Sequence, residues 1–199
     1  MNPLSLLHEL ILRAFERKWA IISLFLLALC SAICGIILVK TPTFYEYHLR
    51  ICDRFLNRVC YSDRSVVQIF FERTAGNVLI LMLLLAGGVH PAALVLPTTT
   101  IAFRAYTFGG TLAILFSVYN MAGALVALTL YLPVHLLIDC IFLLAGSISF
   151  SRAFCFRFTS SDFRELLFDF LLLSGLIALI CLLEAILLGI LFHPIGNIL

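Results

Sequence analysis

The fold is decided by the stretch from Leu132 to Arg152, which reads LPVHLLIDCIFLLAGSISFSR. It is long enough and apolar enough to cross a bilayer, yet it contains Pro133, His135 and Asp139. Each ionisable group at membrane depth costs roughly 2.5–3.5 kcal/mol on insertion scales. His135 and Asp139 are four residues apart, so on a helix they share one face. That face must meet other helices or a wet cavity rather than lipid.

The composition of the whole chain agrees with this interpretation. Of its 199 residues, 63% are hydrophobic and 12% are charged, and the mean hydropathy is +1.13. Soluble domains are about 25% charged and only about half apolar. The sequence therefore predicts an all-α, polytopic helical bundle in a membrane. The formal net charge of +2 is too small to indicate nucleic acid as a partner, and no run of four Lys or Arg indicates a lipid head-group site. We therefore expect partners in or beside the membrane, namely membrane lipids and other membrane proteins.

Five apolar segments are long enough to span a membrane, since about 20 helical residues cross a 30 Å hydrocarbon core. We predict spans at residues 19–39, 76–96, 101–119, 121–151 and 166–192, within a single transmembrane domain of residues 19–199. Pro133 is expected to break the fourth span, because proline removes a backbone donor and clashes with the preceding turn. The first span lacks a small-residue cleavage site and is expected to remain as an anchor.

Two hydrophilic sections flank the first span. Residues 1–18 predict an amphipathic helix on the cytoplasmic surface, or simply the beginning of the first span. Residues 40–74 predict an external loop that forms an interfacial hairpin of one amphipathic helix and a second short helix over Val66–Arg73. Apolar residues recur there at intervals of three and four, and Ile51 and Phe55 among them are candidates for contact with a partner.

The cysteines and the motifs give no sign of catalysis. Cys52 and Cys60 could form a disulfide only if the helix between them breaks, because eight helical residues span about 12 Å. No cysteine pair has zinc-ligand spacing with histidines nearby. The chain also lacks a His-Glu-x-x-His motif, a Gly-x-Ser-x-Gly elbow and a phosphate loop. We therefore expect a protein that is not an enzyme and has no metal or other cofactor.

Orientation follows from the basic residues in the connections. With a cytoplasmic amino terminus and five crossings, the inside holds seven basic residues and the outside six, and the inside residues lie next to spans. We therefore predict that the amino terminus is cytoplasmic and the carboxyl terminus is outside.

Four ionisable residues lie at membrane depth: Arg104, His135, Asp139 and Glu184. In one interpretation they pair to fix helix register, for example Arg104 with Glu184 or His135 with Asp139. In the other they form a path for protons or ions. Small residues on the third and fourth spans should allow close helix packing; these are Ala105, Gly109, Gly110 and Gly146.

The order of these features resembles a known family. An aromatic pair and Asn77 follow the external loop, and Arg104-Ala105 leads to Gly109. The Leu132-Pro133-x-His135 segment runs through a carboxylate to Ala145-Gly146, and Leu183-Glu184-Ala185 lies in the last span. This order resembles the stage II sporulation protein M family over nearly the whole chain, most closely from Phe70 to Arg152. It departs from the family where Asp139 is followed by Cys140 and Ile141 instead of Pro-Ala.

The resemblance implies a multi-pass protein of the bacterial cell membrane that has no active site. Such proteins recruit two peptidoglycan hydrolases, stage II sporulation proteins D and P, to the septum during engulfment. A membrane scaffold is therefore the expected function. The alternative is a small channel or transporter subunit, in which broken helices line a cavity with a polar site at His135 and Asp139.

Overall fold

The computed structural model describes residues 18–60, 65–153 and 160–188. All regular structure in these ranges is helical. The elements are α2 (Lys18–Leu38), α3 (Pro42–Cys60), α4 (Val66–Ala86), the 3-10 helix η1 (Pro91–Leu94), α5 (Val95–Val118), α6 (Asn120–Val126), the π-helix η2 (Ala127–Tyr131), α7 (Leu132–Ala153) and α8 (Ser160–Leu187).

Five helical segments are long and apolar enough to cross a membrane, so the chain is a multi-pass membrane protein. They are Lys18–Leu38, Val66–Ala86, Pro91–Val118, Gly123–Phe150 and Phe163–Leu187. The prediction of an all-α membrane bundle is confirmed. The amphipathic helix expected in residues 1–18 lies almost wholly outside the described residues, and so does the end of the last predicted span.

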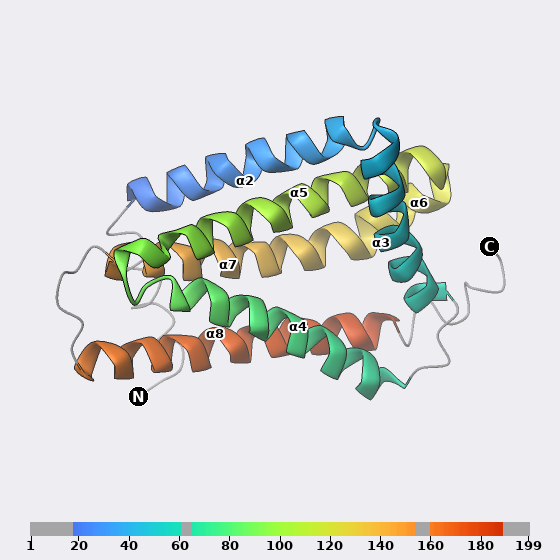
Figure 1. The fold of residues 1–199 in the computed structure, drawn as a ribbon. Coiled ribbons are helices and arrows are strands. Elements are labelled where there is room, and N and C mark those ends of the chain that lie inside the picture. Colours follow the sequence, from blue (N-terminus) through green and yellow to red (C-terminus); the bar gives the residue numbers. More distant parts are fainter. Residues whose placement is uncertain (1–17, 61–64, 154–159, 189–199) are drawn as a thin grey trace.

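The long helices run side by side, and α3 crosses one end of the bundle (Figure 1). Helix α5 packs against α2, α3, α4 and α7, and α7 packs against α2, α4, α5 and α8. Helices α5 and α7, which carry Arg104, His135 and Asp139 among the four ionisable residues predicted at membrane depth, are therefore central. An apolar core that includes Leu24, Leu81, Ile138, Phe142 and Leu173 fills the half of the bundle away from α3. A second core lies toward α3.

The boundaries of the second and third spans differ from the prediction. Helix α4 begins at Val66 and runs unbroken to Ala86, so the predicted short helix over Val66–Arg73 is the beginning of the span. The reason is a capping box, in which Ser65 and Gln68 satisfy each other's backbone amides. The predicted hairpin is therefore wrong in its second arm.

The connection between these spans also lies elsewhere. The chain turns over residues 87–94, whereas the predicted connection at Pro97–Thr100 is helical and belongs to the first turns of α5. Proline is tolerated in the first turn of a helix, where its missing N–H has no partner to lose. Pro97 is buried there and packs against Gly87, where a β-carbon would overlap the proline ring.

The prediction that Pro133 breaks the fourth span is wrong. The helix does not end there; instead, the preceding residues Ala127–Tyr131 form a π-helical turn, in which the amide of Leu132 donates to the carbonyl of Ala127. A π-turn widens the helix, which accommodates the proline ring and the missing donor without separating two half-helices. The sharp reversal of the chain lies earlier, at Asn120, which has a φ of 48°.

Helix α3 is the amphipathic helix of the loop, and its inner face is buried against α5. His48 is fully buried and its ring packs on that of Tyr106, with centroids 5.1 Å apart. Burial without a hydrogen-bond partner lowers the pKa of His48, so the ring is neutral at pH 7. Cys52 is buried with a free thiol in an unbroken helix, and burial together with Asp53 raises its pKa to about 12.

Phe55 is wrong as a candidate for contact with a partner, because its side chain is only 7% exposed. Its ring packs edge-on against Tyr131, with centroids 5.1 Å apart. The apolar residues that recur at intervals of three and four in α3 thus pack on the bundle and are not available on the loop for a partner. Ile51 is half-buried.

Close approach of α2 and α5 depends on small residues. A β-carbon at Gly35 would collide with the carbonyl oxygen of Tyr106, and one at Gly109 would collide with the backbone of Ala32. Such contacts bring two backbones together, which is how membrane helices associate without a hydrophobic driving force.

The other small residues meet side chains instead of backbones. A β-carbon at Gly110 would overlap the ring of His48, and one at Gly146 would crowd Ile101. Ala105 is half-buried on α5. The absence of a side chain at Gly110 therefore leaves room for His48, which allows α3 to pack on the bundle.

We predict that Gly35→Ala destabilises the protein by about 1–3 kcal/mol, because overpacking forces the two backbones apart. The measurement is unfolding by denaturant titration in mixed micelles. Gly175→Ala is the matched control, because a β-carbon there meets nothing within 4 Å, and better helix propensity should leave it equally or more stable. Equal stability of the two variants would contradict the close packing of α2 and α5.

Candidate functional site

A polar cluster connects four helices in the half of the bundle nearer α3. Arg73 and Asn77 come from α4, Arg104 from α5, His135 and Asp139 from α7, and Glu184 from α8. On α4 and α7 the paired positions are four residues apart, so each helix presents both side chains on one face.

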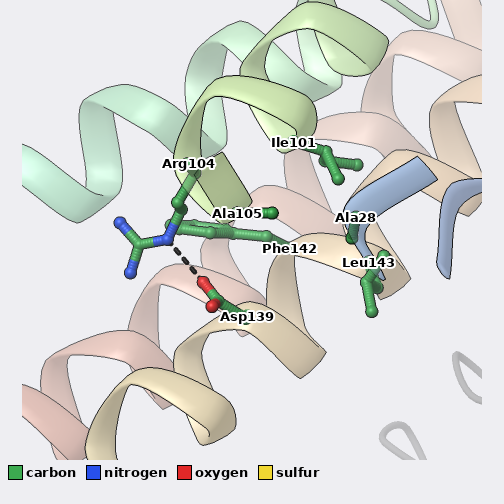
Figure 2. Close-up of a pocket in the computed structure, with 7 residues that line it drawn as sticks. All are labelled: Ala28, Ile101, Arg104, Ala105, Asp139, Phe142 and Leu143. Atoms are coloured by element: carbon green, nitrogen blue, oxygen red, sulfur yellow. Dashed lines mark hydrogen bonds and ion pairs between the residues drawn. The ribbon is translucent and has the colours of Figure 1, made fainter. Parts of the chain in front are cut away.

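The first ion pair joins α5 to α7. Nε of Arg104 donates to Oδ1 of Asp139 at 2.5 Å, and the two side chains are 17% and 24% exposed. The guanidinium also lies over the ring of Phe142, 4.5 Å from its centroid (Figure 2). Its Nη1 donates to Asn77 at 3.3 Å, and its Nη2 lies 3.5 Å from Nδ1 of His135. The arginine is thus the centre of the cluster.

The second ion pair joins α4 to α8. Nη2 of Arg73 donates to Oε1 of Glu184 at 2.5 Å, and Glu184 is only 1% exposed. Asn77 connects the two pairs, because its Nδ2 donates to the backbone carbonyl of Arg73 while its Oδ1 accepts from Arg104. Each buried carboxylate therefore has an arginine from another helix.

The partners differ from those expected, and both suggested pairings are wrong. Arg104 binds Asp139 and not Glu184, and His135 approaches Arg104 while Asp139 binds the same arginine. The reason is the arrangement of the helices: α8 packs along α4, so Arg73 is the cation that Glu184 meets.

Two members of the cluster were not predicted as site residues. The predicted external loop of residues 40–74 includes Arg73, and Asn77 is predicted only as a residue at the beginning of the second span. A signal for Arg73 was present in Ser65-x-x-Gln68, since a capping box at that position starts a helix that includes Arg73.

A crevice of about 310 Å³ opens between α3 and the cluster. Its walls come from α3, α4, α5, the π-turn and α7, and its polar lining residues are Tyr47, Arg54, Arg73, Thr107, Thr111, Tyr131 and His135. A separate cavity of about 40 Å³ borders Arg104 and Asp139, among the apolar side chains of Ala28 and Leu143 (Figure 2). That volume is enough for water.

The polar cluster does not continue along the bundle. After Asp139, α7 carries no charged side chain until Arg152, which is about 20 Å further along the helix. The apolar core of Ile138, Phe142 and their neighbours fills the space between. Arg152 belongs to the other end, where it binds Asp169 at 2.9 Å and Glu165 at 3.4 Å.

Among residues 18–60, 65–153 and 160–188, no group of three or more His, Cys, Asp or Glu could hold a metal ion. The buried serines of α7 are engaged in packing: Ser147 donates to the carbonyl of Leu144 and Ser149 to that of Leu84. The ion pairs neutralise the charges of the buried carboxylates and arginines between helices. The side of the cluster that borders the crevice is rich in hydrogen-bond donors.

We predict that Asp139→Asn destabilises the protein by on the order of 3 kcal/mol, because it leaves the Arg104 guanidinium without its counter-ion. Arg104→Gln should cost a similar amount. The double variant should lose clearly less than the sum, since the pair is removed together. Unfolding in mixed micelles measures all three. Additive losses would show that the two residues stabilise the bundle independently, against the geometry described above.

Comparison with known proteins adds no assignment to this site. No family model matches the chain, and no curated protein or solved structure matches it. The functional interpretation therefore depends on the residues and their geometry.

Proposed function

We propose that the protein is a non-enzymatic integral membrane scaffold that holds peptidoglycan hydrolases at the bacterial cell membrane. The resemblance to the stage II sporulation protein M family suggests this class of partner, with stage II sporulation proteins D and P as the model. The scaffold function itself is argued from the bundle.

One observation carries the proposal: the charges buried in the membrane are used within the molecule. Arg73 binds Glu184 and Arg104 binds Asp139, each across a helix interface. Such pairs connect four helices and give each of these two carboxylates a cationic partner inside the bundle. A rigid bundle of this kind supports a protein that presents a surface to others.

The surface that this bundle presents is the outer face of α3. Glu46 and Arg50 are 71% and 76% exposed there and lie 3.8 Å apart. Tyr45, at 37% exposure, lies beside them on the helix. Phe55, which is buried, is excluded from this face.

A channel or transporter subunit is the weaker candidate. The crevice that reaches His135 favours it, since polar side chains at membrane depth often line a pathway. Against it stands the apolar core that separates this cluster from Arg152 and its partners, which leaves a single copy of the bundle without a polar pathway through the described residues.

Charge reversal tests the partner surface. Glu46→Lys should lower co-purification of a cell-wall hydrolase with the chain several-fold, because it changes the exposed face of α3 and nothing in the core. Arg164→Glu is the control, since Arg164 is exposed near the amino end of α8, at the opposite end of the bundle. Equal recovery with both variants would remove α3 as the partner surface. Proton flux in reconstituted vesicles that is lost in Asp139→Asn would favour the channel instead.

We further propose that α3 lies outside the cell and that residues 87–94 face the cytoplasm, with the amino terminus inside and the carboxyl terminus outside. The test uses a variant without the native cysteines and an impermeant maleimide on intact cells. A cysteine at Arg50 should react at once, whereas a cysteine at Val89, which is 47% exposed, should react only after permeabilisation. The reverse pattern would invert the topology.

A further inference from the structure

The crevice beneath α3 has the character of an anion-binding site. Its volume of about 310 Å³ lies at the lower end of the range of small-ligand sites, about 300–1,000 Å³. The described lining residues include Arg54, Arg73 and His135 but no acidic residue. Of the groups that line it, the two arginines can only donate hydrogen bonds.

Some of these donors are incompletely used within the molecule. Arg54 lies on the exposed side of α3, and its Nε donates to the backbone carbonyl of Arg50 at 3.2 Å, not to a carboxylate. Nε of Arg73 is buried and has no hydrogen-bond partner, although Nη2 binds Glu184. This Nε is closed to solvent, as is the unpartnered Oε2 of Glu184. What Arg73 offers a ligand in the crevice is therefore the exposed part of its side chain, which is 19% exposed and borders the crevice.

The remaining polar groups of the wall fit the same ligand. Nδ1 of His135 faces an arginine nitrogen at 3.5 Å, so it accepts, and the neutral ring then carries its proton on Nε2 as a further donor.

The charge balance points in the same direction. Arg73 and Arg104 are neutralised by Glu184 and Asp139, so Arg54 is the cation in excess at the crevice. Arginine provides a planar fork of donors that matches the oxygens of phosphate. Helix α3 is amphipathic and lies across one end of the bundle (Figure 1). Amphipathic helices in this position typically lie in the membrane interface, where lipid headgroups are found.

We propose that this crevice binds a phosphate group, held by Arg54 and by the guanidinium of Arg73, the two arginines that line it. The phosphate comes either from the headgroup of an anionic phospholipid or from a soluble phosphate-bearing ligand. The site is independent of the scaffold function, so each proposal can fail without the other.

The test is binding of phosphatidylglycerol to the full chain, measured by native mass spectrometry from detergent micelles against phosphatidylcholine as the reference lipid. Arg54→Gln should weaken retention of phosphatidylglycerol roughly ten- to a hundredfold, the loss expected for a charge-assisted hydrogen bond. Lys40→Gln is the matched control, because it removes one exposed positive charge at the same end of the bundle and does not line the crevice. Lys40→Gln should retain phosphatidylglycerol to the same extent as the unmodified chain.

A second arm identifies the source of the phosphate. Sodium phosphate is titrated into the lipid-depleted protein by calorimetry, with the same two variants. Binding of phosphatidylglycerol alone assigns a lipid headgroup, and binding of inorganic phosphate that Arg54→Gln weakens assigns a soluble ligand. Equal losses in Arg54→Gln and Lys40→Gln, or no preference for the anionic lipid together with no binding of phosphate, would overturn the proposal. Circular dichroism spectra that match the unmodified chain show that both variants fold.

Discussion

An ionised side chain inside a bilayer must find a partner, and this constraint organises the bundle. Asp139 lies on the central helix α7 and Glu184 on the peripheral helix α8. Neither carboxylate could remain charged if it faced lipid. Each meets an arginine of another helix at 2.5 Å. Asn77 donates a hydrogen bond to the backbone carbonyl of Arg73 and accepts one from the side chain of Arg104. The two ion pairs therefore form one cluster that fixes α4, α5, α7 and α8 relative to one another.

Close packing of small residues completes this framework on the other side. Helix α2 contributes no charge to the cluster and is held through Gly35 and Gly109, where backbones touch. Gly110 then makes room for His48, so α3 can lie on the end of the bundle. The bundle consequently contains two apolar cores, one that includes Phe142 and Leu173 and one toward α3 that includes Phe55 and Leu115, together with the polar cluster and the crevice under α3.

Sequence reasoning succeeded where a local property decided the outcome. The apolar segments identified all five spans, and the period of three and four identified α3, because hydrophobicity and helical spacing are read directly from the residues. It failed where two local signals competed. Arg73 looked like a loop residue because it is charged, but the capping box at Ser65 extended α4 to include it. Pro133 looked like a helix break, but a π-turn absorbed it.

The sequence by itself determined that this is an all-α membrane protein and that Arg104, His135, Asp139 and Glu184 lie within its apolar spans, because transfer from water to lipid depends on each segment's own composition. Only the tertiary structure decided which arginine neutralises which carboxylate, that Phe55 is buried, and that Arg54, Arg73 and His135 border one crevice. Those facts depend on which helices are neighbours. Packing across the whole bundle determines which helices are neighbours, and the sequence of a single segment does not specify that packing.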